Sequence, residues 1–533
     1  MTASRDPAAP AGPVDPVELA LFGAQLAAVC DEMGAVLRHS AFSTNIRDRL
    51  DYSCAVFDAD GALAAQAAHI PVHLGSMAYA MGGVIARIAW RPGDVWVLND
   101  PYLGGTHLPD VTAIAPVFVG DGAGRFAGAK PVGFVANRAH HADIGADTPG
   151  SMPIARALAE EGVIIPPTRL VEGGEILAPV ITRFAAATRN PRQVEGDFAA
   201  QLAACRVGAA RVATLAAGRG AGRFVELLGA LNDHAERLAH AALVAIPDGE
   251  YSAVDLLDGD GLGSDDLAIA VALTVRDGGI VVGFGGTAAA VPGNVNCPLP
   301  VAAAAVLYCF RCLMPDEVPL CAGAFRAITL VAPAGSLVNA RAPSAVAAGN
   351  VETSQRIVDA VFAALAKALP DRIPAASQGT MNNLALGSAA PGASWDYYET
   401  IGGGAGAARG APGASCVQVH MTNTRNTPIE VLELEFPLRV RRYARRAGSG
   451  GAGAARGGDG IVRELEFLAP ATVTVLAERR RHAPWGLAGG AAGAPGVNRI
   501  NGVEQPGKFT REVAAGDILT IETPGGGGWG RVS

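Results

Sequence analysis

Residues 111–139, VTAIAPVFVGDGAGRFAGAKPVGFVANRA, contain two apolar, strand-like runs on either side of a Gly-rich turn. The runs 111–119 and 131–139 are rich in Val, Ala and Phe, and residues 120–130 between them hold four glycines. Two such runs around a Gly-containing turn predict an antiparallel hairpin. The start of the first strand of such a pair lies beside the end of the second. We therefore expect the residues before 111 and those after 139 to meet at one edge of a sheet.

The two segments that this hairpin would bring together are both polar. Residues 99–110 read NDPYLGGTHLPD, and residues 140–151 read HHADIGADTPGS. The pair Gly104-Gly105 predicts a sharp backbone turn just before the first histidine of this region. Five of the ten histidines of the chain lie between positions 69 and 141. This concentration points to a functional site at the predicted sheet edge.

The spacing of these polar residues suggests a metal centre. His107 and Asp110 form an H-x-x-D unit, and His140, His141 and Asp143 form an H-H-x-D unit. Imidazole with carboxylate is a ligand set for a divalent metal such as Zn, Mn or Fe. A single His–Asp pair is more often structural, because the two side chains satisfy one another in a loop. Two such units, one before and one after a single hairpin, would meet at one sheet edge and so favour a metal site.

Other polar residues near these units are candidates for supporting groups. Asp51 begins another predicted strand and is a possible further ligand. Asn99 and Asp100 are candidates for holding the histidines in the correct tautomer and orientation. His69 and His73 lie in HIPVH, where Ile70 and Val72 suggest a packed segment, so the predicted ligands do not include them.

Elsewhere the hydrophobic pattern predicts long helices between short strands and Gly-rich turns. Apolar residues recur at helical spacing over 15–38, 75–90, 194–245 and 351–370. We therefore predict a multi-domain, sheet-rich mixed α/β (α+β) fold whose strand order does not follow from spacing. We predict a disordered tail at 1–16 and an N-terminal metal-bearing domain at 17–250. A central α+β domain at 251–438 should follow, and then a strand-rich C-terminal region with a Gly-rich loop and tail at 439–533.

Composition argues against several classes of function. The net charge of −8 gives no basic footprint for nucleic acid, and RVRRYARR at 439–446 is interpreted as a solvated strand edge. The start of the chain does not resemble a secretory signal, and we expect no stretch of about 18 apolar residues for a membrane span. The eight cysteines show no disulfide-framework spacing, which suggests a cytoplasmic protein. Cys309 and Cys312 are expected to pack in a core.

Common catalytic motifs are missing from the sequence. It contains no G-x-x-x-x-G-K-[ST] loop for nucleotide phosphates and no G-x-S-x-G elbow for a serine hydrolase. The Gly runs at 402–406, 448–460 and 525–530 lack the strand-turn-helix context of a nucleotide site. Cys297 in NVNCP is interpreted as structural, since no partner base can be located. The His/Asp constellation is left as the main candidate for chemistry.

A series of longer motifs resembles the hydantoinase B/oxoprolinase family from about residue 17 to the end. These motifs occur in the family's order and include DYSCAVFD, HIPVHLGSM, NDPYLGGTHLPDV, RAHHADIG, PGNVNCPL, AAGNVETSQRI, PAASQGTMNN, YYETIGGG, HMTNTRNTP, GGDGIVRELEFLAPATVT and RHAPWGL. The resemblance implies the B-type subunit of an ATP-dependent hydrolase that opens cyclic amides such as hydantoins, 5-oxoproline or lactams. The same family supplies large subunits of acetone and acetophenone carboxylases.

The resemblance also implies a division of labour between two subunits. A separate A-type subunit would bind ATP and phosphorylate the substrate, while the B-type subunit would carry one divalent metal. His107, Asp110 and His140 match the family's metal-binding stretch, and Asp51 is the expected fourth ligand. His141 and Asp143 would orient water or tune the metal. No A-type region precedes residue 17, so we expect a hetero-oligomer with a partner encoded elsewhere.

Two departures from the family pattern leave the substrate open. Ala405 stands where a Trp often follows YYETIGGG, and Gln418 replaces a common His two residues before His420. An ATP-dependent ketone carboxylase subunit is the main alternative function, because it would use the same metal loops. A non-catalytic scaffold subunit is the second alternative.

Overall fold

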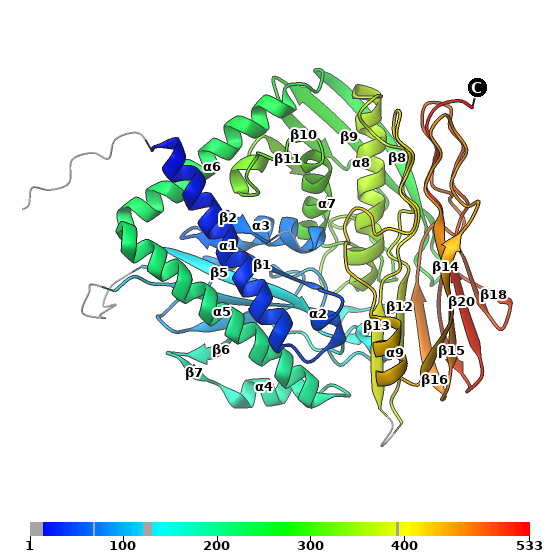
Figure 1. Ribbon diagram of the computed structural model, residues 1–533, viewed down its shortest axis with the longest axis horizontal. Coiled ribbons are helices and arrows are strands. Elements are labelled where there is room, and N and C mark those ends of the chain that lie inside the picture. Colours follow the sequence, from blue (N-terminus) through cyan, green and yellow to red (C-terminus); the bar gives the residue numbers. More distant parts are fainter. Residues whose placement is uncertain (1–13, 68–69, 121–129, 391–393, 533) are drawn as a thin grey trace, which may run out of the picture.

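The computed structural model describes residues 14–67, 70–120, 130–390 and 394–532. Residues 1–13 of the predicted tail, nearly all of the predicted turn at 120–130, and His69 lie outside these ranges. The last residues of the predicted tail are ordered, because Asp15 caps a helix that begins at Pro16. Over the described residues the strands form four sheets; helices cover the first two, and the last two pack against each other (Figure 1). The predicted multi-domain mixed α/β architecture is confirmed.

A seven-stranded antiparallel sheet carries the predicted hairpin, with the strand order β2-β1-β5-β4-β3-β6-β7. Its strands in chain order are β1 (Tyr52–Asp58), β2 (Leu63–Gln66), β3 (Val95–Leu98), β4 (Asp110–Val117), β5 (Gly133–His140), β6 (Thr168–Glu172) and β7 (Glu175–Ile176). Asp110 lies directly opposite His140 in the β4–β5 register. The antiparallel hairpin predicted from the sequence is therefore confirmed, and it places the two polar segments at one edge.

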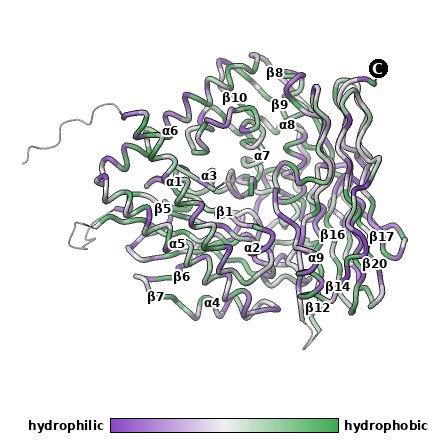
Figure 2. The backbone as a smooth tube through the Cα atoms, viewed as in Figure 1, coloured by the Kyte–Doolittle hydropathy of each residue, from purple (hydrophilic) through white to green (hydrophobic). Residues whose placement is uncertain are grey.

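Helices cover both faces of this sheet. One face packs against α1 and α5, and the other packs against α3 (Figure 1). The helices of this part are α1 (Pro16–Ser40), α2 (Thr44–Arg47), α3 (Pro71–Ile85), α4 (Ala178–Ala185), α5 (Pro191–Arg219) and α6 (Ala221–Leu243), with 3-10 turns at Pro149–Ser151 and Leu158–Glu160. Hydrophilic and hydrophobic stretches alternate along α6 in Figure 2, as expected for a helix with one buried face.

The helix α1 corrects the expectation that no stretch could span a membrane. It contains an 18-residue window of mean hydropathy 1.4 and is, among the described residues, the one helix that is long and apolar enough. The inner face of α1, including Phe22, Leu26 and Met33, packs into the core with α5 and β1. Exposed apolar residues such as Val17 and Leu21 add to this mean hydropathy beside the buried face.

A second sheet and two helices form the central part. The strands β11-β10-β9-β8 form this sheet, and α7 and α8 share its hydrophobic core. The elements are β8 (Gly249–Gly259), β9 (Asp265–Arg276), β10 (Gly279–Gly283), α7 (Leu299–Arg311), a 3-10 turn (Ala322–Phe325), β11 (Ile328–Val331) and α8 (Ser354–Ala368). A π-helical turn, Gly349–Thr353, leads into α8 and carries residues of the candidate site.

A four-stranded sheet and a five-stranded sheet pack face to face in the C-terminal part (Figure 1). Their strand orders are β13-β12-β16-β19 and β14-β15-β20-β17-β18. The elements are β12 (Asn383–Ser388), β13 (Trp395–Glu399), α9 (Ile429–Glu435), β14 (Leu438–Arg446), β15 (Gly460–Phe467), β16 (Ala471–Leu476), β17 (Val497–Ile500), β18 (Val503–Gln505), β19 (Lys508–Val513) and β20 (Ile518–Glu522).

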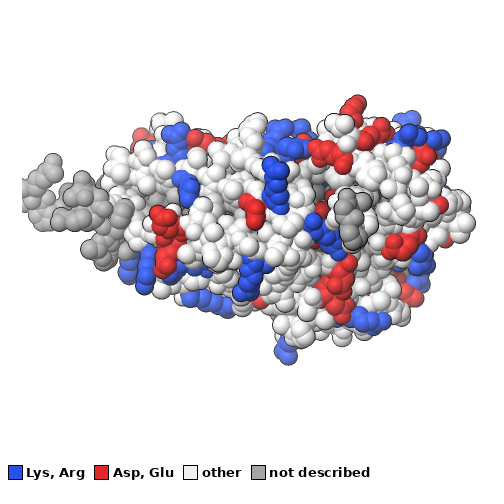
Figure 3. All heavy atoms as spheres, turned by 90° about the horizontal axis from the view of Figure 1, so that it is seen from below, with Lys and Arg blue, Asp and Glu red and all other residues white. Residues whose placement is uncertain are grey.

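The basic cluster at 439–446 lies on β14, which is an edge strand as predicted. Arg439 and Arg441 form ion pairs with Glu466 of the neighbouring strand, at 3.4 and 3.2 Å. Acidic and basic side chains are also interspersed over the face drawn in Figure 3. The cluster is thus partly neutralised by its own sheet.

The Gly-rich segments are close-packed. Segments 402–406, 450–458 and 524–528 run against one another and exchange backbone hydrogen bonds, such as Gly458 N to Ala405 O and Gly526 N to Gly458 O, both 2.9 Å. A Cβ added at Gly526 would lie 1.9 Å from the Ala405 carbonyl oxygen. The absence of side chains is what lets these backbones approach, so the glycines have a packing role.

Candidate metal centre

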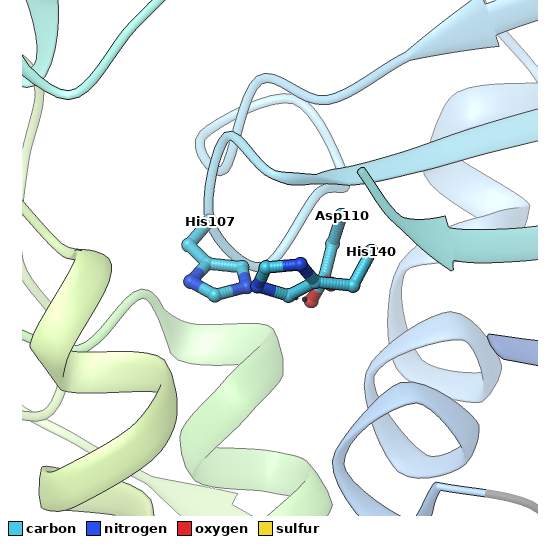
Figure 4. Close-up of side chains that lie close together, drawn as sticks. All are labelled: His107, Asp110 and His140. Atoms are coloured by element: carbon cyan, nitrogen blue, oxygen red, sulfur yellow. Dashed lines mark ion pairs between the residues drawn. The ribbon is translucent and has the colours of Figure 1, made fainter. Parts of the chain in front are cut away.

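The hairpin and the loop before it bring three predicted ligands together. His107 comes from the turn before β4, Asp110 begins β4, and His140 ends β5. One ligand atom from each lies within 4.8 Å of those of the other two, and all three residues are buried. Figure 4 shows the two imidazole rings side by side with the Asp110 carboxylate next to them. This arrangement could hold a metal ion.

Asp110 is the centre of this cluster. Its Oδ2 lies 3.2 Å from His107 Nε2 and accepts a 2.5 Å hydrogen bond from Thr106 Oγ1. Its Oδ1 lies 3.2 Å from Nε2 of His73. The Asn350 amide on the π-helical turn approaches Oδ2 at 3.5 Å. The carboxylate is therefore held from both sides by groups of three separate segments.

His73 belongs to the site, although the sequence interpretation excluded it. It lies in the first turn of α3, is 1% exposed, and reaches Asp110 and, at 4.0 Å, Asp51 Oδ1. The Ser53 hydroxyl lies 3.4 Å from its Nδ1. His73 therefore sits between the two carboxylates and can steady Asp110.

Asp51 lines the same cavity but is less close than the other predicted ligands. Its carboxylate pairs with Arg49 Nη2 at 3.8 Å, and its backbone carbonyl accepts a hydrogen bond from the His140 amide at 3.0 Å. It is absent from the tight three-residue cluster. Its position is compatible with a fourth ligand or with a partner for Arg49.

The cluster faces a small cavity of about 20 Å³. This volume is enough for one water molecule or ion. The cavity walls include apolar side chains, which are Ile70, Val72, Val351, Met381 and Met421. Among the described residues, His107 Nδ1 and His140 Nε2 are buried without a hydrogen-bond partner. Unpaired buried nitrogens are costly, so these donors and this space fit a bound cation.

Protonation states also suit a cation. Burial alone would raise the pKa of Asp110, but His107 and His73 beside it hold that pKa well below the usual range. Burial lowers the pKa of His140 far below that of a free imidazole. Asp110 is therefore a carboxylate and His140 is neutral, and these are the forms that bind metals.

The structure does not bring His141 and Asp143 to the cluster, and neither lines its cavity. His141 Nε2 lies 3.0 Å from Gln201 Oε1, and its ring packs on Phe198. Asp143 accepts hydrogen bonds from Ser151 and from the Arg189 backbone. Consecutive residues at a strand end point to opposite faces, so the side chain after His140 turns away. The expected water-orienting role finds no contact to support it.

Asn99 shapes the loop that carries His107. Its amide donates to the Leu108 carbonyl at 2.8 Å, and its Oδ1 accepts from the Ile165 N–H at 2.6 Å. Gly105 packs against the Asn99 backbone, because a Cβ at position 105 would lie 2.3 Å from the Asn99 carbonyl oxygen. Asp100 caps the turn by accepting from Tyr102 N at 2.9 Å. Both predicted supporting residues thus act on the loop backbone, through which they position His107.

Glu352 is a second buried carboxyl group next to the site. It follows Val351 of the cavity wall and accepts hydrogen bonds from Asn383 Nδ2 and Met381 N at 2.7 and 3.0 Å. Burial raises its pKa to about 8. The group is therefore largely protonated in the folded protein at neutral pH.

Glu352 predicts a loss of stability as the pH rises. A carboxyl group with a raised folded-state pKa contributes stability that is complete below its unfolded value, near 4.5, and is lost as the pH passes about 8. Glu352→Gln keeps the acceptor oxygen and removes the titration. Urea unfolding at pH 5 and pH 8.5 should show that this variant loses less stability than the wild type, by about 1 kcal/mol or more. Equal losses in both proteins would contradict the assignment.

Together the fold and the site define a mixed α/β protein with a buried His–Asp cluster of the kind that binds a divalent cation. The profile of the hydantoinase B/oxoprolinase family matches residues 15–532. The chain belongs to the hydantoinase B/oxoprolinase family, as the motif series predicted.

Named relatives and a solved structure agree with this membership. The chain is 38% identical to 5-oxoprolinase 1 of Arabidopsis thaliana over 97% of its own length, but it spans only 42% of that protein. It is 31% identical to a putative B-type D-/L-hydantoinase subunit of a Pseudomonas strain, covering 97% of this chain and 90% of the relative. The ATP-dependent caprolactamase from Pseudomonas jessenii superposes with a TM-score of 0.89 at 28% identity, covering 98% of this chain and 92% of that one.

Proposed function

We propose that this chain is the metal-bearing B-type component of an ATP-dependent hydrolase that opens a cyclic amide ring. The observation that carries the proposal is the buried His107–Asp110–His140 cluster facing a small cavity. Similarity to a hydantoinase subunit, to 5-oxoprolinases and to a caprolactamase supports a cyclic amide as the substrate class.

In this proposal His107, Asp110 and His140 hold one divalent cation, and Asp51 is the proposed fourth ligand. Two nitrogen donors with carboxylate oxygen suit Zn, Mn or Fe. When bound, such a cation polarises a carbonyl or lowers the pKa of water. The chain's own residues then have two tasks. His73 and Thr106 fix the Asp110 carboxylate, and the apolar walls limit access of bulk water.

The ATP-dependent step is proposed to belong to an A-type partner. The sequence holds no P-loop, and the Gly-rich runs that could suggest one pack against each other instead. The match to a putative B-type hydantoinase subunit extends over nearly the full length of both chains, which supports a separate partner chain. Phosphorylation of the amide oxygen there would prepare the ring for attack by water.

The test is ring opening by the chain combined with its A-type partner. We expect ATP-dependent conversion of a hydantoin, 5-oxoproline or a lactam, measured by product formation and phosphate release. The reaction should cease without ATP and after chelation of the metal.

Other outcomes would redirect the assignment. Bicarbonate-dependent consumption of a ketone, with no turnover of any cyclic amide, would place the chain in a carboxylase. Full activity in metal-depleted protein would reject a catalytic metal and favour a scaffold role for this chain.

A further inference from the structure

Asn45 contacts the nitrogen of His140 that faces away from the cluster. It lies in the short helix α2, is fully buried, and places its Nδ2 3.1 Å from His140 Nδ1. The opposite ring nitrogen, Nε2, is buried and has no hydrogen-bond partner among the described residues. One ring nitrogen of the proposed ligand His140 therefore has a hydrogen-bond partner, and the other has none among the described residues.

Arg49 fixes which end of the Asn45 amide faces the histidine. Its Nη1 lies 3.3 Å from Asn45 Oδ1, and a guanidinium can only donate hydrogen bonds. The atom facing Arg49 is therefore the amide oxygen, and the NH₂ group faces His140. Arg49 is itself buried and donates to the carbonyl of Tyr398 at 3.0 Å and to the hydroxyl of Thr400 at 3.3 Å.

This orientation determines the tautomer of His140. An amide NH₂ has no lone pair to offer, so His140 Nδ1 must be the acceptor. The proton of the neutral imidazole is then on Nε2. A ligand nitrogen needs a free lone pair, and Nε2 is the nitrogen left for the cation because Nδ1 is occupied by Asn45.

We propose that, in the metal-free protein, Asn45 holds His140 in the tautomer that cannot bind a cation through Nε2. Metal loading then requires the Asn45 amide to flip, so that its Oδ1 and Nδ2 exchange places. The inference rests on the proposed metal centre. Turning over would place Oδ1 against a proton on Nδ1, which is the arrangement that supports metal-bound histidines.

The surroundings show how the turned amide could be accommodated. Its NH₂ group would then face Arg49 Nη1, donor against donor. Nη1 would still have a partner, because it also donates to the Tyr398 carbonyl at 3.0 Å. The His140 ring stacks on Tyr398 with centroids 4.7 Å apart and planes 2° apart, which holds the ring plane in place. Loading thus changes the Asn45 amide and Arg49 rather than the backbone.

The tautomer can be observed directly in protein stripped of metal. At pH 8, where an ordinary imidazole is neutral, neutron diffraction or ¹⁵N NMR of histidine-labelled protein should place the His140 proton on Nε2. In Asn45→Asp the carboxylate can only accept, so the proton should move to Nδ1. A proton on Nδ1 in the wild type would overturn the proposal. This measurement needs no bound metal, so it stands even if the proposed function fails.

Zinc affinity, measured by competition with a chelating dye, gives the second test. Asn45→Asp should bind zinc at least about 10-fold more tightly than the wild type, and Asn45→Leu should bind within about threefold of the wild type or more tightly. If Asn45 instead supports metal binding by His140 in its present orientation, Asn45→Leu should bind zinc about 10- to 100-fold more weakly than the wild type. That loss, in a variant that unfolds at the wild-type temperature, would overturn the proposal. Absence of zinc binding in every protein would instead reject the metal centre.

Discussion

Replacing His107 with alanine is expected to reduce the metal content of the purified protein from about one ion per chain to below about 0.1. His107 supplies one of the three donors that lie within 4.8 Å of each other, and Nδ1 of its buried ring has no other partner among the described residues. The proposed ATP-dependent turnover with an A-type partner should fall by at least about 100-fold. Elemental analysis of protein purified without added metal, followed by the ring-opening assay, measures both effects.

An exposed histidine provides the matched control. His240 lies on the outer face of α6, and His240→Ala should keep both the metal and the activity. Circular dichroism should show that both variants remain folded, so that a loss of metal can be attributed to the ligand. If His107→Ala retains its metal and full turnover, the metal-site assignment is wrong.

The centre of this site could be predicted because one local pattern determines it. Two apolar runs with a Gly-rich turn specify a hairpin, and antiparallel pairing then forces Asp110 opposite His140. No knowledge of distant segments is needed for that step. The groups that complete the cavity, such as Asn350 and Tyr398, come from far along the chain, and no local periodicity could have placed them there.

His73 shows how a local pattern can mislead. Ile70 and Val72 suggested a packed segment, and both do pack, but they pack in the wall of the cavity at the candidate metal centre. Pro71 begins α3, so the backbone at this point is helical and His73 is brought to the same side as its apolar neighbours. A Pro just before the histidine was a usable signal for a helix start.

His141 lies apart from the cluster, and strand geometry accounts for its position. His140 ends β5 and His141 follows it directly, and neighbouring side chains along a strand point to opposite faces. Only His140 can face the cluster once Asp110 opposite it does, and His141 instead meets Gln201 on α5. Strand alternation, continued past residue 139, separates the two histidines from the sequence alone.

For the fold, element types were predictable and strand order was not. The helices at 16–40, 221–243 and 354–368 follow from apolar spacing with capping or Pro signals. Strand order depends on pairings between distant segments, such as β12 with β16 or β3 with β6. Such pairings are set by tertiary packing, which the local pattern of either strand does not contain.

Replacing Gly526 with alanine is expected to destabilise the protein by about 3 kcal/mol or more. The new Cβ would lie 1.9 Å from the Ala405 carbonyl oxygen and 2.3 Å from its carbonyl carbon. Both obstacles are backbone atoms, so no side chain can move away to make room. Gly526 also donates to Gly458 O and accepts from Gly451 N, both at 2.9 Å, so a shift of the segment would break hydrogen bonds on two sides.

Urea unfolding measures the effect, and Gly285→Ala is the control. A Cβ at Gly285 meets nothing within 4 Å, and its φ is not in the left-handed range, so its stability should change by less than about 0.5 kcal/mol. Equal unfolding midpoints for Gly526→Ala and the wild type would contradict the close packing of segments 402–406, 450–458 and 524–528. Because these segments contribute no donor to the His–Asp cluster, partly folded Gly526→Ala protein should lose metal only as it unfolds, whereas His107→Ala should lose metal while still folded. The two variants therefore separate packing by glycine from ligation by histidine.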